Sequence, residues 1–180
     1  MKGMVSTSFL YLIEERYGLD MVESVIEEAK LPSGGIYTTV GTYSHTELID
    51  MIVVLSKKTN ISTENLTKTF GIYLFAELIA AYPQWIEGLK SSFELLKRVD
   101  GFIHAEVRKL YPGAAPPKLK CERYTDTTME LVYESPRCMA DIAEGLIQGC
   151  ASHYGEKIII RRERIGDKSG SSERFLLTLD

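Results

Sequence analysis

Two adjacent prolines, Pro116 and Pro117, divide the chain into two parts with different hydrophobic periodicities. Before them, apolar residues recur with the spacing of amphipathic helices. After them, short apolar runs are bounded by polar and turn residues, as in β-strands. Because a double proline suits neither the interior of a helix nor a central strand, it marks the end of the helical part.

The sequence predicts an α+β fold: a helical N-terminal half, then a four-stranded antiparallel sheet with an inserted helix. A capping box of Ser44 and Glu47 is expected at the start of the third helix. We expect one domain over 1–180, with a helical subdomain over about 1–60 and the rest over about 61–180. Helices are expected at 9–18, 19–30, 45–59, 64–82, 91–111 and 138–155, strands at 118–124, 129–135, 157–165 and 174–180, and a glycine- and serine-rich turn at 166–173.

The composition excludes several classes of protein. A net charge of −4 argues against a nucleic-acid-binding surface, and the arginines at 161, 162 and 164 alternate with Glu163 as at a solvated strand end. The three cysteines fit neither a disulfide framework nor a zinc site. With neither a signal peptide nor a membrane span, the sequence predicts a protein of the reducing cytoplasm that contacts no membrane.

His104 lies in the predicted helix at 91–111, at the border of an apolar stripe. That stripe contains Leu96, Val99, Ile103, Val107 and Leu110, and Phe93 lies beside His104. The commoner interpretation is a half-buried helix residue, and the other is a ligand. Nothing in this segment alone overturns the commoner interpretation.

The run "YESPR" places Tyr133, Ser135 and Arg137 on one face of a strand, because side chains alternate along strands. Two hydroxyls and a guanidinium together suit a carboxylate. On its own, the run is more commonly a strand whose arginine pairs with a nearby glutamate.

Catalytic motifs are missing from the sequence. It has no nucleophile elbow, phosphate-binding loop, dinucleotide fingerprint or zinc-protease motif, and His45 and His153 have no further metal ligands nearby. We therefore expect a protein that is not an enzyme.

Together, these segments resemble the haem–nitric oxide/oxygen binding (H-NOX) family, bacterial relatives of the haem domain of soluble guanylate cyclase. The resemblance covers essentially the whole chain. It rests on "IHAEVRKLYPGAAPP" at 103–117 and on "YESPR" followed by "AEGLIQG", with "MKG" and "FGIYLF" as weaker support.

The resemblance implies haem b (iron protoporphyrin IX) buried between the two parts of the fold. It makes His104 the axial ligand of the iron, and Tyr133, Ser135 and Arg137 the binding site of the haem propionates. Pro117 becomes a proximal contact that distorts the macrocycle. The distal pocket is then expected to consist of Val5, Phe9, Leu74, Ile142 and Leu146.

Family members that hold oxygen have a distal tyrosine where this chain has Ile142. Since oxygen on ferrous haem gains most from a hydrogen-bond donor, the resemblance implies a sensor of nitric oxide that binds carbon monoxide and discriminates against oxygen. Tyr11 and Tyr73 remain possible donors.

The resemblance also implies that nitric oxide weakens the iron–His104 bond, after which the haem relaxes and the N-terminal helices shift. Because no effector domain accompanies the sensor here, we expect a separate partner. A histidine kinase is the first choice, and a diguanylate cyclase or phosphodiesterase is the second. The alternatives are an oxygen-binding haem protein, a haem enzyme such as a peroxidase or dioxygenase, and a haem-free interaction domain.

Overall fold

The four strands form one antiparallel sheet, as expected, and their order in it is β1-β2-β4-β3. The computed structural model describes residues 1–166 and 171–180. The central pairing joins β2 to β4, so two hairpins are fused side by side. Part of the turn predicted at 166–173 lies outside the described residues. The strands are β1 (Lys118–Tyr124), β2 (Thr128–Glu134), β3 (Ile158–Arg164) and β4 (Ser172–Leu179).

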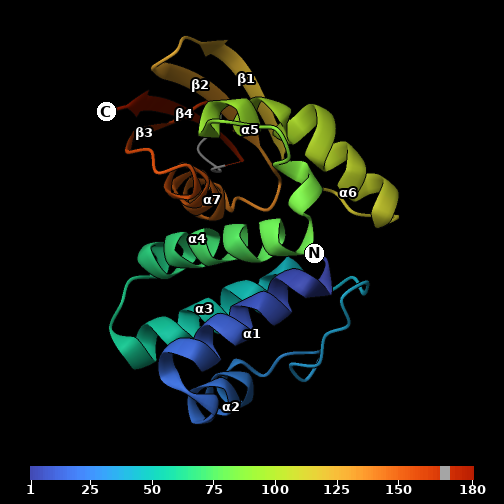
Figure 1. Cartoon of the computed structure of the whole chain (residues 1–180). Coiled ribbons are helices and arrows are strands. Elements are labelled where there is room, and N and C mark those ends of the chain that lie inside the picture. The colour runs from blue at the N-terminus through green and yellow to red at the C-terminus, as the bar shows by residue number, and fades with distance from the viewer. Residues whose placement is uncertain (167–170) are drawn as a thin grey trace.

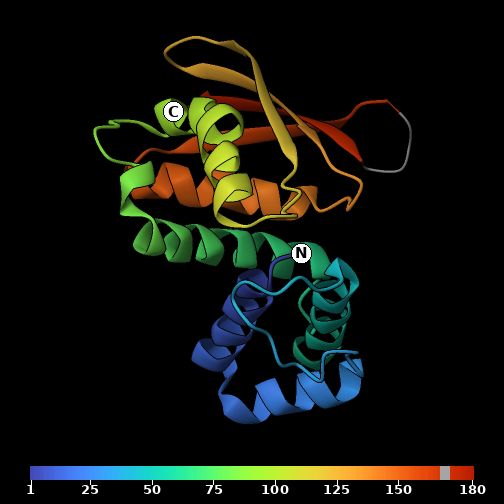
Figure 2. The same cartoon turned by 90° about the vertical axis from the view of Figure 1, so that its right-hand side faces the viewer.

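The helices form two groups that meet at α4 (Figures 1 and 2). In both views α4 lies between the N-terminal helices and the sheet with α7. No helix in the described parts of the chain is both long and apolar enough to cross a membrane. The helices are α1 (Gly3–Tyr17), α2 (Leu19–Ala29), α3 (His45–Thr59), α4 (Thr63–Ala81), the 3₁₀ helix η1 (Pro83–Trp85), α5 (Ser92–Arg98), the π-helix η2 (Val99–Ile103), α6 (His104–Leu110) and α7 (Ala140–His153).

Two hydrophobic cores correspond to the two groups. The N-terminal core contains residues of α1, α2, α3 and the first part of α4, together with Ile142. The second core lies between the sheet, α5 and α7, and it begins on α4 at Phe75. Helix α4 therefore contributes to both cores. The subdomain boundary expected at about residue 60 stays a prediction.

Glycines allow α4 and α7 to pack closely. A Cβ atom added to Gly71 of α4 would lie 2.4 Å from the carbonyl oxygen of Ile142, and one added to Gly145 of α7 would lie 2.1 Å from that of Lys68. Only residues without a side chain fit at this crossing, so α4 holds α7 and its side chains at a fixed place.

Two predicted details of the polar residues are wrong. Ser44 caps α3 as expected and accepts a hydrogen bond from the Thr46 amide. Glu47, however, is buried and accepts hydrogen bonds from Ser33 and Tyr37, because the loop before α3 folds over it.

Arg162 is not at a solvated strand end. Its side chain is 24% exposed, and it forms ion pairs with Asp141 and Glu144 of α7 and with Glu173 of β4. These contacts attach α7 to the sheet. The interpretation failed because three acidic groups from other elements meet over this strand.

The helix predicted at 91–111 is interrupted. The π-helix η2 occupies Val99–Ile103, and α6 starts at His104. Each π-turn adds one residue, which rotates the following helix by about 100° relative to a continuous α-helix. Leu110, expected in the apolar stripe, is the last residue of α6 and is 53% exposed.

Candidate functional site

A cavity of about 320 Å³ lies between the two parts of the fold. Its volume falls within the usual range for a small-molecule site. Helices α1, α4 and α7 form one side, and η2, α6, the loop after α6 and the sheet form the other. The wall is mostly apolar, and the few polar side chains on it therefore indicate what it binds.

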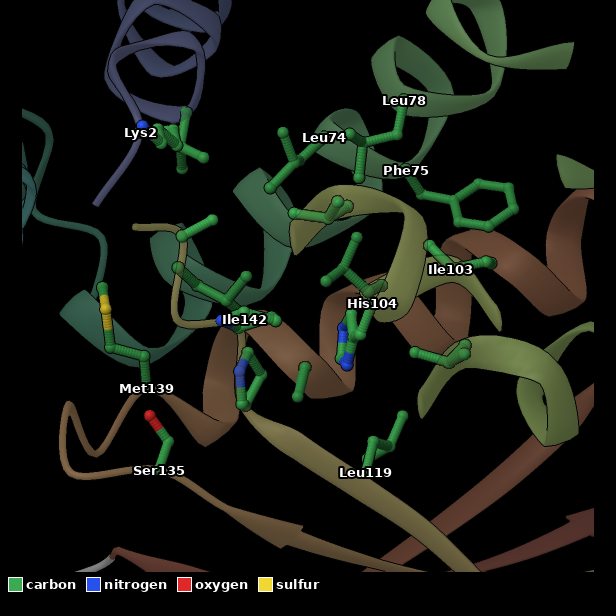
Figure 3. Close-up of a pocket in the computed structure, with 18 of the residues that line it drawn as sticks. Lys2, Leu74, Phe75, Leu78, Ile103, His104, Leu119, Ser135, Met139 and Ile142 are labelled. Atoms are coloured by element: carbon green, nitrogen blue, oxygen red, sulfur yellow. The ribbon is translucent and has the colours of Figure 1, made fainter. Parts of the chain in front are cut away.

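His104 points into this cavity in Figure 3. Its side chain is 14% exposed, and its Nδ1 atom lies 3.4 Å from Oδ1 of Asp100, four residues earlier. Burial lowers the pKa of His104, although Asp100 opposes this effect. A neutral imidazole whose Nδ1 faces a carboxylate leaves Nε2 as the nitrogen for a metal.

The π-helix gives His104 its direction. It ends at Ile103, so the ring is carried by the first residue after the extra turn. Such π-turns occur frequently at functional sites. Sequence reasoning placed His104 at the edge of a stripe and missed the π-turn, because apolar residues keep a helical spacing on both sides of it.

Tyr133, Ser135 and Arg137 come together at the end of β2 and line the same cavity. The Tyr133 hydroxyl accepts a hydrogen bond of 3.2 Å from the Met139 amide. The Ser135 hydroxyl accepts one of 3.2 Å from the Arg137 amide. Arg137 donates from Nη1 to the Ala115 carbonyl over 2.7 Å, which leaves its other donors for a ligand.

Pro117 and Pro116 also line the cavity. They follow α6 along the chain and lead directly into β1. The rigid segment between the helix of His104 and the sheet is therefore part of the wall.

Four of the five residues predicted for the distal pocket line the cavity: Val5, Leu74, Ile142 and Leu146. Phe9 does not. It is fully buried in the N-terminal core, edge-on to Phe70 with ring centroids 5.1 Å apart. Phe9 shares a helix face with Val5 but lies about 6 Å farther along α1, which takes it past the cavity.

The two tyrosines considered as possible donors lie elsewhere. Tyr11 is 52% exposed, and Tyr73 lies next to Glu77 and Glu15. Burial and these carboxylates raise the pKa of Tyr73 to about 12. Neither tyrosine lines the cavity.

Sequence reasoning missed Tyr82 and Tyr111, which do line the cavity. Their hydroxyls are hydrogen-bonded to each other, and Tyr82 stacks on Trp85 with ring centroids 4.3 Å apart. Burial and Tyr111 raise the pKa of Tyr82 to about 12. No pattern in the sequence joins these residues, since each lies where a different helix ends.

Metal-binding clusters made only of protein ligands are not found in the described residues. No group of three or more His, Cys, Asp and Glu side chains there could hold a metal ion. His104 therefore does not belong to such a group.

The sequence matches the haem-NO-binding family over residues 2–162. A curated relative, the soluble guanylate cyclase gcy-35 of Caenorhabditis elegans, is 23% identical over 171 residues. That match covers 89% of this chain but only 24% of the relative, so the chain spans about a quarter of the cyclase.

Two solved structures of H-NOX proteins are similar over nearly the whole chain. The unliganded Fe(II) H-NOX protein from K. algicida is 32% identical, with a TM-score of 0.92 over 100% of this chain and 97% of that one. The H-NOX from Shewanella woodyi, solved with IWP-051 in the Fe(II)CO state, is 41% identical, with a TM-score of 0.83 over 99% of this chain and 94% of that one.

Proposed function

Because the chain belongs to the haem-NO-binding family, whose members are haem-based gas sensors, we propose that it holds iron protoporphyrin IX in this cavity and senses nitric oxide. The observation that carries the proposal is the cavity itself. It brings the imidazole of His104 together with the hydroxyls of Tyr133 and Ser135 and the guanidinium of Arg137.

The residues of the cavity suit this cofactor. Apolar side chains from both cores match the faces of a flat macrocycle, and His104 presents a single neutral nitrogen between them. Tyr133, Ser135 and Arg137 supply donors for carboxylates at one end. When bound, the haem would supply an iron that can take a diatomic gas.

The side chains on α1, α4 and α7 support selectivity for nitric oxide and carbon monoxide. Val5, Leu74, Ile142 and Leu146 contain no hydrogen-bond donor in their side chains. A ligand that develops negative charge, as oxygen does, gains little there, whereas nitric oxide and carbon monoxide depend less on a donor. The carbon monoxide state of the Shewanella woodyi protein supports carbon monoxide as a ligand.

The signal is proposed to start at His104 and to travel along α6. This helix begins at His104 and is followed by Tyr111, whose hydroxyl is bonded to Tyr82 at the end of α4. Weaker ligation of His104 would remove a restraint from the start of α6. Since α4 belongs to both cores, a shift at Tyr82 reaches both parts of the fold.

The output is proposed to be a separate protein, with a histidine kinase as first choice and a diguanylate cyclase or phosphodiesterase as second. Family analogy supports this proposal, and no residue of the described chain identifies the partner. The three free cysteines support a reducing, cytoplasmic compartment.

The test replaces His104 by glycine. We expect His104→Gly to lose tight haem binding, measured as haem content and Soret absorption, and added imidazole to restore the spectrum by occupying the vacated place. His153→Gly, which changes an exposed histidine of α7, is the control and should keep its haem.

Wild-type spectra complete the test. The absorption spectrum of the ferrous protein is recorded under argon, air, carbon monoxide and nitric oxide. We expect it to change under carbon monoxide and nitric oxide, and we expect no stable oxygen complex in air. Normal haem occupancy and gas spectra in His104→Gly, or a stable oxygen complex or peroxide turnover in the wild type, contradict the proposal.

A further inference from the structure

The charged residues on the cavity wall all have the same sign. Among the described residues, the wall contains Lys2 and Arg137 but no aspartate or glutamate. Lys2 directly precedes α1, and Arg137 follows β2, so each part of the fold provides one cation. In the view of Figure 3, Lys2 and Ser135 lie on the same side of the cavity relative to His104.

Both cations contact one short loop. Lys2 donates from Nζ to the Pro112 carbonyl over 3.3 Å, and Arg137 donates from Nη1 to the Ala115 carbonyl over 2.7 Å. The two carbonyls are three residues apart, and three residues of extended chain span at most about 11 Å. The two cations therefore contact a short segment. Two cations on either side of one short loop suit a small molecule that has two carboxylates.

The ammonium group of Lys2 contacts neutral groups. It donates to two neutral carbonyls, those of Val40 and Pro112, and lies 5.9 Å from the centroid of the Tyr111 ring. Within the described residues, the ion pairs do not include Lys2. The pKa of the Met1 amino group is lowered by burial, then by Arg137 and Lys2, which places both cations in electrostatic range of one point.

We propose that Lys2 is the second carboxylate-binding cation of this cavity. This inference rests on the proposed function: Arg137, with Tyr133 and Ser135, binds one haem propionate, and Lys2 binds the other. The N-terminal helices and the sheet are then attached to the same cofactor through separate carboxylates. Lys2 thereby becomes a positioning residue that links the orientation of α1 to that of the haem.

The alternative is that Lys2 only supports the loop through the Pro112 carbonyl. Haem analogues separate the two roles. The wild-type protein, Lys2→Gln, Lys2→Arg and the control Lys57→Gln, which removes an exposed lysine of α3, are each loaded with haem or with its two monomethyl esters. Release to excess apomyoglobin is then followed by Soret absorption.

We expect Lys2→Gln to release haem about threefold to tenfold faster than the wild type, the range for one partly exposed charge-assisted contact. The wild type should release one of the two ester isomers faster than haem, by a similar factor. Lys2→Gln should release that same isomer no faster than it releases haem. Lys2→Arg should restore the sensitivity to that isomer, and Lys57→Gln should match the wild type.

Equal acceleration of haem and both esters by Lys2→Gln assigns Lys2 to loop support alone and overturns the inference. An unchanged rate of haem release in Lys2→Gln overturns the inference too. Neither result contradicts the proposed function. Failure of the wild-type protein to take up haem instead refutes the proposed function.

Discussion

Ile142 is the residue on which the proposed gas selectivity depends most. It lies in the first turn of α7, is 9% exposed and lines the cavity. A tyrosine at this position would bring a hydroxyl into an otherwise apolar region. Since a hydrogen bond to a charged acceptor contributes about 1.5–3 kcal/mol, we expect Ile142→Tyr to raise oxygen affinity about tenfold to a hundredfold.

The measurement is oxygen binding by the ferrous protein, with Ile142→Phe as the matched control, since phenylalanine has the ring without the hydroxyl. The phenylalanine variant should stay close to the wild type in oxygen affinity. Equal oxygen affinities in the tyrosine and phenylalanine variants would show that a hydrogen bond at this position is not what the wild type lacks.

Residues that line the cavity were predictable where residues close together along the chain belong to one element. Tyr133, Ser135 and Arg137 meet because a strand end brings alternate residues together. Lys2 and Tyr82 also line the cavity, but each reaches it from the end of a helix. Their positions depend on how whole helices pack, which no local pattern encodes.

At the scale of elements, the strands were the most predictable part. Residues 118–124 were expected as a strand and form β1 with the same bounds, because the segment is bounded by prolines and a turn. The π-helix was not predictable, since one inserted residue leaves the local composition helical. The element that orients His104 was thus the one that sequence periodicity concealed.

The π-helix gives a prediction of its own. Deletion of Gly101 should convert η2 into an α-helical turn and rotate the start of α6 by about 100°. We expect the helix content by circular dichroism to stay nearly constant, while haem affinity falls at least about tenfold, because the axial ligand points elsewhere.

Gly101→Ala is the control for this deletion. A Cβ atom at Gly101 meets nothing within 4 Å, so the substitution keeps the π-turn without a clash and should retain haem. If the deletion variant binds haem as tightly as the wild type, the direction of His104 does not depend on the π-turn.

At the scale of the whole molecule, the cavity separates the two hydrophobic cores except along α4, α7 and the loops that cross between them. Residues of both cores line the cavity, so a cofactor bound there would contact both. Because ligand binding stabilises only the folded state, haem at a thousandfold its dissociation constant adds about 4 kcal/mol to the free energy of unfolding. This stabilisation should be concentrated where few other contacts exist.

We therefore expect removal of haem to affect hydrogen exchange unevenly. The segment from η2 through α6 to Pro117 contains no fully buried side chain in its helices, so its amides should lose protection first. The pairing of β4 with β2, centred on the buried Phe175 and Leu177, should keep most of its protection. Exchange measured by mass spectrometry on apo and haem-loaded protein checks both. Uniform loss of amide protection across the sheet and α6 would mean that the cofactor stabilises the whole fold as one unit. Selective loss of protection around His104 would instead identify α6 as the element through which ligation controls the rest of the chain.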